Sequence, residues 1–382
     1  MLSLTLAVGC GDANAKKASA INTPRQGSEQ ASGPGVAAME SQTAQPQQAG
    51  GGTAANQAPS SAEEAAPPPT VFAARELAKV LDFTKLPAPE GAEIGQSNPA
   101  HLEAKVPGQV PATAAFYQDK MAALGWNADD GPGKMVSDDY ASMRFKKDGH
   151  VAFMSIIKFG KNKPECNVTL WFYGNFDTRT LPRSEGAKLT YGSQTQTMYT
   201  SSKKVPAEAD WVAKALASQG WQTFAAFNTA MRQSDDQRVM NLRRQGYTLD
   251  VLIGSAPAQG NQTSVSYMVR ALGHELPAPA AATKVEFDDD QWKMQCETPG
   301  TLEATAEFYR TAMPAAGYKP LAGETPQERY VNLRFGTAAG DIVLVQVSKR
   351  DAKSSKVLIV GTPAAVLEKL RKEEEKKSST AK

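Results

Sequence analysis

The chain has 382 residues, and its 42 lysines and arginines nearly balance its 40 aspartates and glutamates, giving a formal net charge of +2 at pH 7. So small a net charge creates no field that would steer the chain onto DNA, RNA or an anionic membrane surface, and composition therefore argues against a nucleic-acid-binding protein. Every Trp, Tyr and Phe lies from Phe72 onward. The folded part is expected to begin near that residue, because a core needs large apolar side chains.

The first ten residues, MLSLTLAVGC, form a short apolar run in which the small residue Gly9 precedes Cys10. This pattern resembles the end of a bacterial lipoprotein signal, in which the cysteine becomes the lipidated first residue of the mature protein. The resemblance implies a membrane anchor on Cys10 and a place in the cell envelope, on its periplasmic or surface side. No later stretch is apolar and long enough to span a bilayer. The alternative is an ordinary disordered N-terminus with a chance cysteine.

Residues 11–75 are predicted to be a disordered tether. Between residues 11 and 70 the only large apolar side chains are Ile21, Val36 and Met39, set among Ala, Gln, Gly, Ser and Pro. Such a segment cannot bury enough surface to offset the entropy lost on ordering. As a flexible coil it would have a root-mean-square reach of roughly 45 Å.

The rest of the chain repeats itself with a period of about 95 residues. A Leu-Pro pair opens each copy, and a Gly-aromatic pair follows later in it. These pairs are Leu86-Pro87, Leu181-Pro182 and Leu276-Pro277, then Gly125-Trp126, Gly220-Trp221 and Gly317-Tyr318. A solenoid repeat is shorter, roughly 20 to 50 residues, whereas this period suits a complete small domain. We therefore predict three repeats, at residues 76–176, 177–273 and 274–363.

Each copy begins with two short predicted strands and a helix. The strands are expected at 92–94 and 102–106, 188–191 and 197–200, and 284–287 and 292–296. Val110-Pro111 and Val205-Pro206 precede the first two helices, predicted over 112–124 and 207–219, and the third copy has Leu302-Glu303 there. Proline suits the first turn of a helix. The glycine of each Gly-aromatic pair is expected to end the helix in a left-handed conformation.

Three further strands follow each helix. They are predicted near 142–145, 150–159 and 167–173, at 240–242, 247–253 and 263–272, and at 333–335, 341–347 and 356–360, with turns at Gly149, Gly246 and Gly340. Short connections favour antiparallel pairing. The fold class is thus α+β: three tandem repeats, each an antiparallel sheet in ββαβββ order with one helix packed on a face. Residues 364–382 are predicted as a charged C-terminal helix and tail, whose apolar face is only Val366, Leu367 and Leu370.

Catalytic and metal-binding patterns are missing from the sequence. His101, His150 and His274 occupy different places in the repeats and are expected to be polar surface residues. No His-x-x-x-His or His-Glu-x-x-His spacing offers a zinc site, and no cofactor motif occurs. Cys166 and Cys296 are expected to be separate thiols rather than a disulfide or a nucleophile.

Two charged clusters have a simple interpretation as surface charges. Asp288-Asp289-Asp290 lacks the alternate spacing and the glycine of a calcium loop, which favours a solvated hairpin tip. The basic residues of two strands are interpreted as charges that discourage pairing between sheets, with an anion site as the alternative. They are Arg144, Lys146 and Lys147 in the first repeat and Arg243 and Arg244 in the second.

One strand offers a candidate interaction surface. In 168–173, VTLWFY, alternation places Trp171 and Tyr173 on the face opposite Val168, Leu170 and Phe172. Packing between repeats would explain these aromatic residues as well as a sugar or peptide ligand would.

The sequence as a whole favours a non-enzymatic, membrane-tethered envelope lipoprotein with three tandem binding modules. Its partner would be an envelope protein or glycan, and several modules on one tether would raise avidity. One alternative is a structural spacer whose modules pack on each other, and another is an enzyme with a site between modules.

Overall fold

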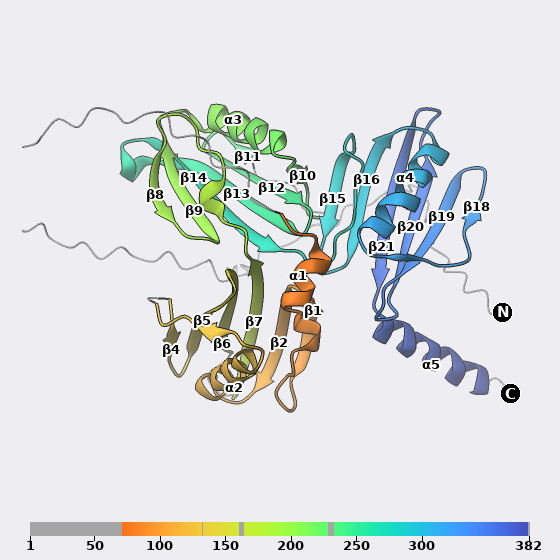
Figure 1. The fold of residues 1–382 in the computed structure, drawn as a ribbon, viewed down its shortest axis with the longest axis horizontal. Coiled ribbons are helices and arrows are strands. Elements are labelled where there is room, and N and C mark those ends of the chain that lie inside the picture. The colour runs from red at the N-terminus through yellow and green to blue at the C-terminus, as the bar shows by residue number, and fades with distance from the viewer. Residues whose placement is uncertain (1–70, 132, 160–163, 228–232, 381–382) are drawn as a thin grey trace, which may run out of the picture. The chain divides into compact units, whose positions relative to one another are not determined.

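The structure is a computed structural model that describes residues 71–380 except 132, 160–163 and 228–232. Cys10 and residues 11–70 of the predicted tether therefore lie outside the described residues. Three antiparallel sheets follow one another along the chain, each accompanied by a long helix (Figure 1). This confirms the predicted α+β class and its tandem repetition.

The first module follows a short helix, α1 (Ala74–Val80), and a 3-10 turn, η1 (Phe83–Lys85). Its elements are β1 (Glu93–Asn98), β2 (His101–Pro107), α2 (Val110–Ala123), β3 (Asn127–Ala128), β4 (Met135–Val136), β5 (Tyr140–Lys147), β6 (His150–Lys158) and β7 (Glu165–Gly174). The strand order across the sheet is β1-β2-β7-β6-β5-β3, and β4 also pairs with β5.

The second module has the same order of elements. They are η2 (Thr178–Thr180), β8 (Lys188–Gly192), β9 (Gln196–Ser201), α3 (Val205–Ser218), β10 (Gln222–Phe224), β11 (Gln233–Ser234), β12 (Gln237–Arg244), β13 (Tyr247–Ala256), η3 (Pro257–Gln259) and β14 (Gln262–Ala271). Its sheet order is β10-β12-β13-β14-β9-β8, with β11 on β12.

The third module and the last helix complete the chain. They consist of β15 (Thr283–Asp288), β16 (Lys293–Pro299), α4 (Leu302–Ala315), β17 (Lys319–Pro320), β18 (Thr325–Pro326), β19 (Tyr330–Gly336), β20 (Ile342–Lys349), β21 (Ser354–Thr362) and α5 (Ala364–Thr380). The order β15-β16-β21-β20-β19-β17 repeats that of the first module. Each module also has two short strands between its helix and its third long strand, such as β3 and β4, which are too short to show an alternating pattern.

Helices α2, α3 and α4 end just before the predicted glycines, and α2 and α3 begin two residues earlier than predicted. Helices α2 and α3 start at Val110 and Val205, so that the proline lies inside the first turn. At the other end the backbone N–H of Trp126 donates to the carbonyl of Met121 at 3.0 Å, and Gly125 has a φ of 81°. Trp221 and Tyr318 make the same bond in their modules. This is the Schellman arrangement, which satisfies carbonyls that a helix end leaves open.

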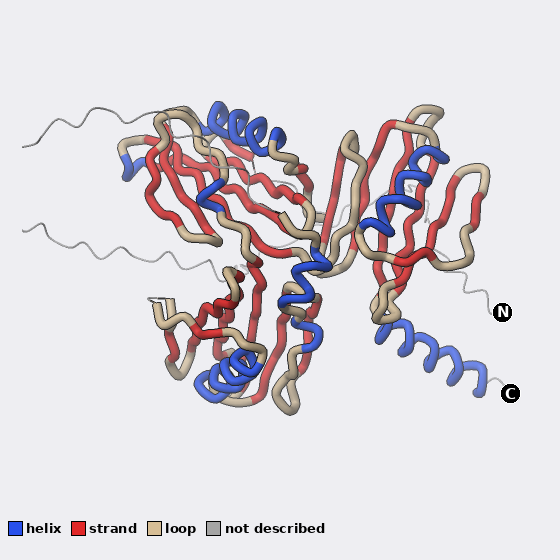
Figure 2. The backbone as a smooth tube through the Cα atoms, in the orientation of Figure 1, coloured by secondary structure: helices blue, strands red, loops and turns tan. Residues whose placement is uncertain are grey.

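Each helix covers one face of its sheet (Figure 2). The helix side chains that face the sheet are fully buried; they are Tyr117 and Met121 in α2, Val212 and Leu216 in α3, and Tyr309 and Met313 in α4. The first residues of the predicted apolar stripe, such as Phe116, are only half-buried. Among the described residues, no helix of the same module lies on the opposite face of its sheet, so the exposed side chains of the sheets lie on that face or at the edges.

The cores of the first two modules are connected, whereas the third module has a core of its own. Phe176, in the segment between β7 and η2, joins the first two, since its ring lies 5.6 Å from that of Trp221 and 5.5 Å from that of Tyr247. Helix α1, not predicted from the sequence, reaches both cores. Its Leu77 packs in the shared core and its Ala74 in the third.

Gly246 lies in a turn, as predicted, and the docking of α1 explains why a glycine is needed there. The positive φ belongs to the preceding Gln245, at 48°. Gly246 instead lies against the backbone of Phe72 and Ala74, and a Cβ there would be 2.6 Å from the Ala74 nitrogen. The N–H of Gly246 donates to the Phe72 carbonyl, and the carboxylate of Glu275 accepts from the Ala74 N–H. Part of the range predicted as tether, 71–75, thus belongs to the folded part.

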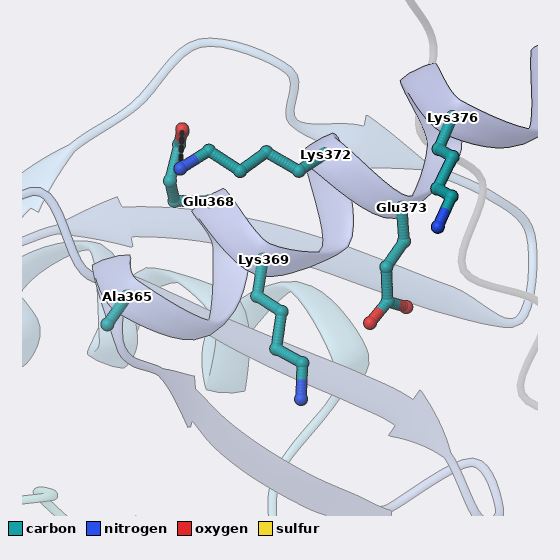
Figure 3. A pocket seen from close by; sticks show the side chains of 6 residues that line it. All are labelled: Ala365, Glu368, Lys369, Lys372, Glu373 and Lys376. Carbon is teal, nitrogen blue, oxygen red and sulfur yellow. Dashed lines mark ion pairs between the residues drawn. The ribbon is translucent and has the colours of Figure 1, made fainter. Parts of the chain in front are cut away.

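Helix α5 is attached at its start, where the N–H of Ala364 donates to Asp341 Oδ1 at 2.9 Å. Its apolar residues Val366 and Leu370 stay almost half exposed. One side of the helix lines an open hollow of about 380 Å³ formed by its own Glu and Lys side chains, including the pair of Glu368 and Lys372 (Figure 3). Because a single helix forms this hollow, it has no enclosing walls to hold a ligand. Within the described part of the chain, no helix combines the length and apolarity needed to cross a bilayer.

Candidate interaction surface of the middle module

The joints between modules account for several residues that the sequence singled out. Trp171 lies on the open face of the first sheet and stacks on His101, with ring centroids 3.5 Å apart and planes 6° apart. The guanidinium of Arg270, from β14 of the second module, lies 4.9 Å from the Trp171 centroid. Tyr173 is half-buried beside it, and burial raises the pKa of its hydroxyl. These contacts are the packing between modules that we considered as the alternative to a ligand, and binding at Trp171 and Tyr173 stays a prediction.

The acidic run of the third module is a joint rather than a solvated hairpin tip. Asp289 accepts hydrogen bonds from the backbone N–H groups of Gly273 and His274, at 2.8 and 2.9 Å. Asp290 accepts from Asn98 Nδ2 at 3.1 Å and lies 2.9 Å from Nδ1 of His101. The loop thereby connects the third module to both others, which a local sequence pattern cannot show.

Two of the histidines depart from the predicted surface role, whereas the cysteines agree with their prediction. His101 is 2% exposed, and His274 stacks on Trp292 at 4.0 Å, so that two of the three predicted surface histidines are joint residues. Cys166 and Cys296 are free and buried, which confirms two separate thiols. Burial raises the pKa of both thiols, which keeps them protonated and poorly nucleophilic.

Arg243 differs from the exposed strand charge that we predicted. It is 7% exposed, donates to the Leu276 carbonyl at 2.8 Å, and lies over the ring of Phe287 at 5.2 Å. Its burial lowers the pKa of the guanidinium to about 10. Arg243 therefore packs the second module against the third, whereas Lys146 is an exposed partner of Asp129, as expected for a surface charge.

The open face of the second sheet carries a row of residues, apolar except for Ser266, that crosses its five long strands; we call it the apolar row. Each residue of the row is paired with the next one on the neighbouring strand. In order, the row is Tyr191 (β8), Met198 (β9), Ser266 (β14), Leu252 (β13) and Val239 (β12). Tyr191 and Leu252 are each 46% exposed, and Met268 nearby is 38% exposed. Apolar side chains aligned in this way on an open face are typical of an interaction site.

On the long strands of the other two modules the same row is polar except for Leu358 in the third module. Glu103 and Gln295 occupy the place of Met198, because each lies seven residues before the start of its helix. Across the five long strands the rows are Gln96, Glu103, Thr169, Ser155 and Ser142 in the first module, and Glu286, Gln295, Leu358, Gln346 and Asn332 in the third. The short strands extend these rows to the exposed Met135 in the first module and to Thr325 in the third. In the third module, amides pair with neighbours in the row, as Gln295 does with Glu286 at 2.6 Å. The apolar row is thus a property of the middle module and not of the fold.

A hollow of about 720 Å³ lies on this face of the middle module. Its lining combines apolar and uncharged polar groups, among them Met198, Leu252, Gly254, Ser255, Ser264 and Ser266. The volume falls within the usual range for ligand pockets, roughly 300 to 1,000 Å³. Asp236 is the one charged residue of the lining. This surface was not predicted from the sequence, because recognising it requires the register of five strands.

Among the described residues, no group of three or more His, Cys, Asp and Glu side chains is placed to hold a metal ion. The buried carboxylate of Glu208 in α3 is enclosed in the core, where it accepts hydrogen bonds from the hydroxyls of Tyr199, Ser201 and Ser184. A carboxylate satisfied in this way stabilises the fold and is not placed to meet a substrate.

Comparison with protein-family models, with curated proteins and with solved structures found no match to this chain.

Proposed function

We propose that this chain is a non-enzymatic, lipid-anchored envelope protein that binds a partner through the open face of its middle module. The observation that carries the proposal is the difference between equivalent rows: Tyr191, Met198 and Leu252 replace polar residues of the flanking modules. Water-exposed apolar groups gain roughly 25 cal/mol for each Å² that a partner covers. The flanking modules gain less from such contact, because their polar rows would lose hydration.

The remaining features support this role. The lipoprotein-like end at Cys10 and the tether beyond it would hold the modules at a membrane while letting them search its surroundings. The joints through Asp289, Asp290 and Arg243 fix the modules against each other, so that a partner meets a preformed surface. A preformed surface loses less entropy on binding.

The same joints favour the second candidate, a spacer whose modules only set a distance. A spacer needs contacts between modules and no apolar surface for a partner. The two candidates therefore differ in what the open face of the second sheet contacts in the cell.

Photo-crosslinking in cells tests the proposal. A benzoylphenylalanine is placed at Leu252, and in a matched control at Gln346, which holds the same position in the third module. We expect a discrete adduct from position 252 that disappears with Met198→Glu and persists with Gln295→Glu. Equal labelling from both positions, or none from 252, favours the spacer.

The anchor is tested separately by labelling with palmitate. Native protein is expected to carry the label and to sediment with membranes, and Cys10→Ala to lose both. Retention of both in the variant removes the anchor from the proposal without affecting the binding surface.

A further inference from the structure

The third module shows how the first edge strand of this fold can be extended. Strand β15 is the edge of its sheet, yet the backbone of Ala225, which follows β10 of the second module, lies alongside it. The N–H of Ala225 donates to the Val285 carbonyl at 2.8 Å, and the N–H of Phe287 donates to the Ala225 carbonyl at 2.9 Å. These two bonds form a parallel bridge centred on Glu286.

Apolar packing accompanies this bridge. The ring of Phe224 meets that of Phe287 edge-on, with centroids 5.5 Å apart. Val285 and Phe287 are only 5% and 3% exposed, although they lie on an edge strand. Phe287 also packs in the core of its own module and under Arg243, and the extended segment adds two backbone hydrogen bonds and the Phe224 ring to this edge.

Strand β8 is the equivalent edge of the middle module, and no described strand pairs with its outer side. Tyr191 pairs with Met198 as Glu286 pairs with Gln295, so the two residues are equivalent. The groups that correspond to the Val285 carbonyl and the Phe287 N–H are then those of Thr190 and Gly192. Leu189 and Tyr191 remain 50% and 46% exposed on this strand.

We infer that β8 receives an extended segment of a partner protein, which adds a strand to the second sheet and brings apolar side chains against Leu189 and Tyr191. Strand addition at an open edge is a recurring mode of peptide recognition, in which backbone bonds supply affinity and side-chain contacts supply specificity. Because Tyr191 begins the apolar row, the added strand would lead the partner onto the open face and its hollow. Strand β1 of the first module has Gln96 at that place, and its edge does not border an apolar row.

The inference rests on the proposed function and names its mode of recognition. A suitable probe is the hexapeptide QTFAAF, the sequence of residues 222–227, whose Ala225 already forms the bridge to β15. Two peptides serve as controls. The first is QTFAAF methylated on the nitrogen of its first alanine, which removes the N–H donor that Ala225 uses. The second is NADDG, residues 127–131, which occupy the corresponding place after α2.

Amide chemical shifts and hydrogen exchange of the full labelled chain are measured as each peptide is added. We expect QTFAAF to shift and protect the Gly192 amide saturably, the methylated peptide to bind about tenfold more weakly, and NADDG not to bind. Gly192→Pro, which removes the corresponding donor of β8, should abolish the effect, while Ser97→Pro at the same place on β1 should not. Leu189→Glu is a second variant, since this exposed side chain can change without disturbing the core.

Other results would overturn the inference. If the peptides perturb only residues of the hollow such as Leu252, and methylation has no effect, a partner binds the open face without adding a strand, and the proposed function survives. Shifts confined to β15 would mean that the peptide only replaces the internal segment. No binding by QTFAAF also rejects strand addition, whatever the crosslinking at Leu252 shows.

Discussion

The substitution Gly246→Ala tests whether α1 is a structural part of the folded array. The added Cβ would lie 2.6 Å from the Ala74 nitrogen and from the Phe72 carbonyl oxygen. Both contacts are with backbone, which cannot rotate away as a side chain could. Either the second module deforms locally, or the segment that leads into α1 leaves its place.

The loss in free energy of unfolding is set by whichever of these two responses costs less free energy. Forcing one extra carbon into a well-packed site costs about 1–3 kcal/mol. Releasing α1 loses the burial of Leu77 and Leu81, each 2% exposed, at about 1.5–3 kcal/mol per leucine, partly offset by the entropy that the released segment regains. We therefore expect the free energy of unfolding to fall by about 1–3 kcal/mol.

Urea unfolding gives this free energy, and hydrogen exchange shows which response occurs. Faster exchange confined to residues 74–81 would indicate release of α1. Gly95→Ala is the matched control, because its Cβ would meet only the Glu103 carbonyl at 3.7 Å, an ordinary contact. Equal stability of Gly246→Ala and Gly95→Ala, with unchanged exchange in α1, would refute the docking of this helix.

Three further predictions concern the cores and the joints. Glu208→Ala should lower the free energy of unfolding by about 3 kcal/mol or more, because buried hydroxyls lose their acceptor, and calorimetry would contradict this if the melting temperature were unchanged. Burial raises the pKa of Tyr117 to about 12, so its contribution to stability is complete below pH 10, where an unfolded tyrosine titrates, and is lost as pH rises through 12. Unfolding followed from pH 9 to 12 should therefore show a smaller loss in Tyr117→Phe than in the native chain. Asp289→Ala should speed hydrogen exchange at Gly273 and His274 while the sheet interiors stay protected, and uniform exchange across all modules would contradict a local joint.

The repeats and the fold class could be predicted because their sequence signals depend only on neighbouring residues. Glycines 125, 220 and 317 end their helices because only a residue without a Cβ adopts the left-handed conformation at little cost, and a Schellman bond follows each of them. Alternation of apolar and polar residues predicted the long strands, because the two faces of a strand differ in burial. The two-residue strands and the seven-residue helix α1 carry too few positions for a periodic signal.

The sequence by itself therefore determined what repeats, a sheet with one helix written three times, because helix ends and strand faces depend on neighbouring residues. Only the tertiary structure decided what differs between the copies. Asp289 and Arg243 look like surface charges until a second module supplies their partners. The apolar row from Tyr191 to Val239 exists only through the register of strands that lie far apart in the chain, and hydrogen bonds between those strands set that register.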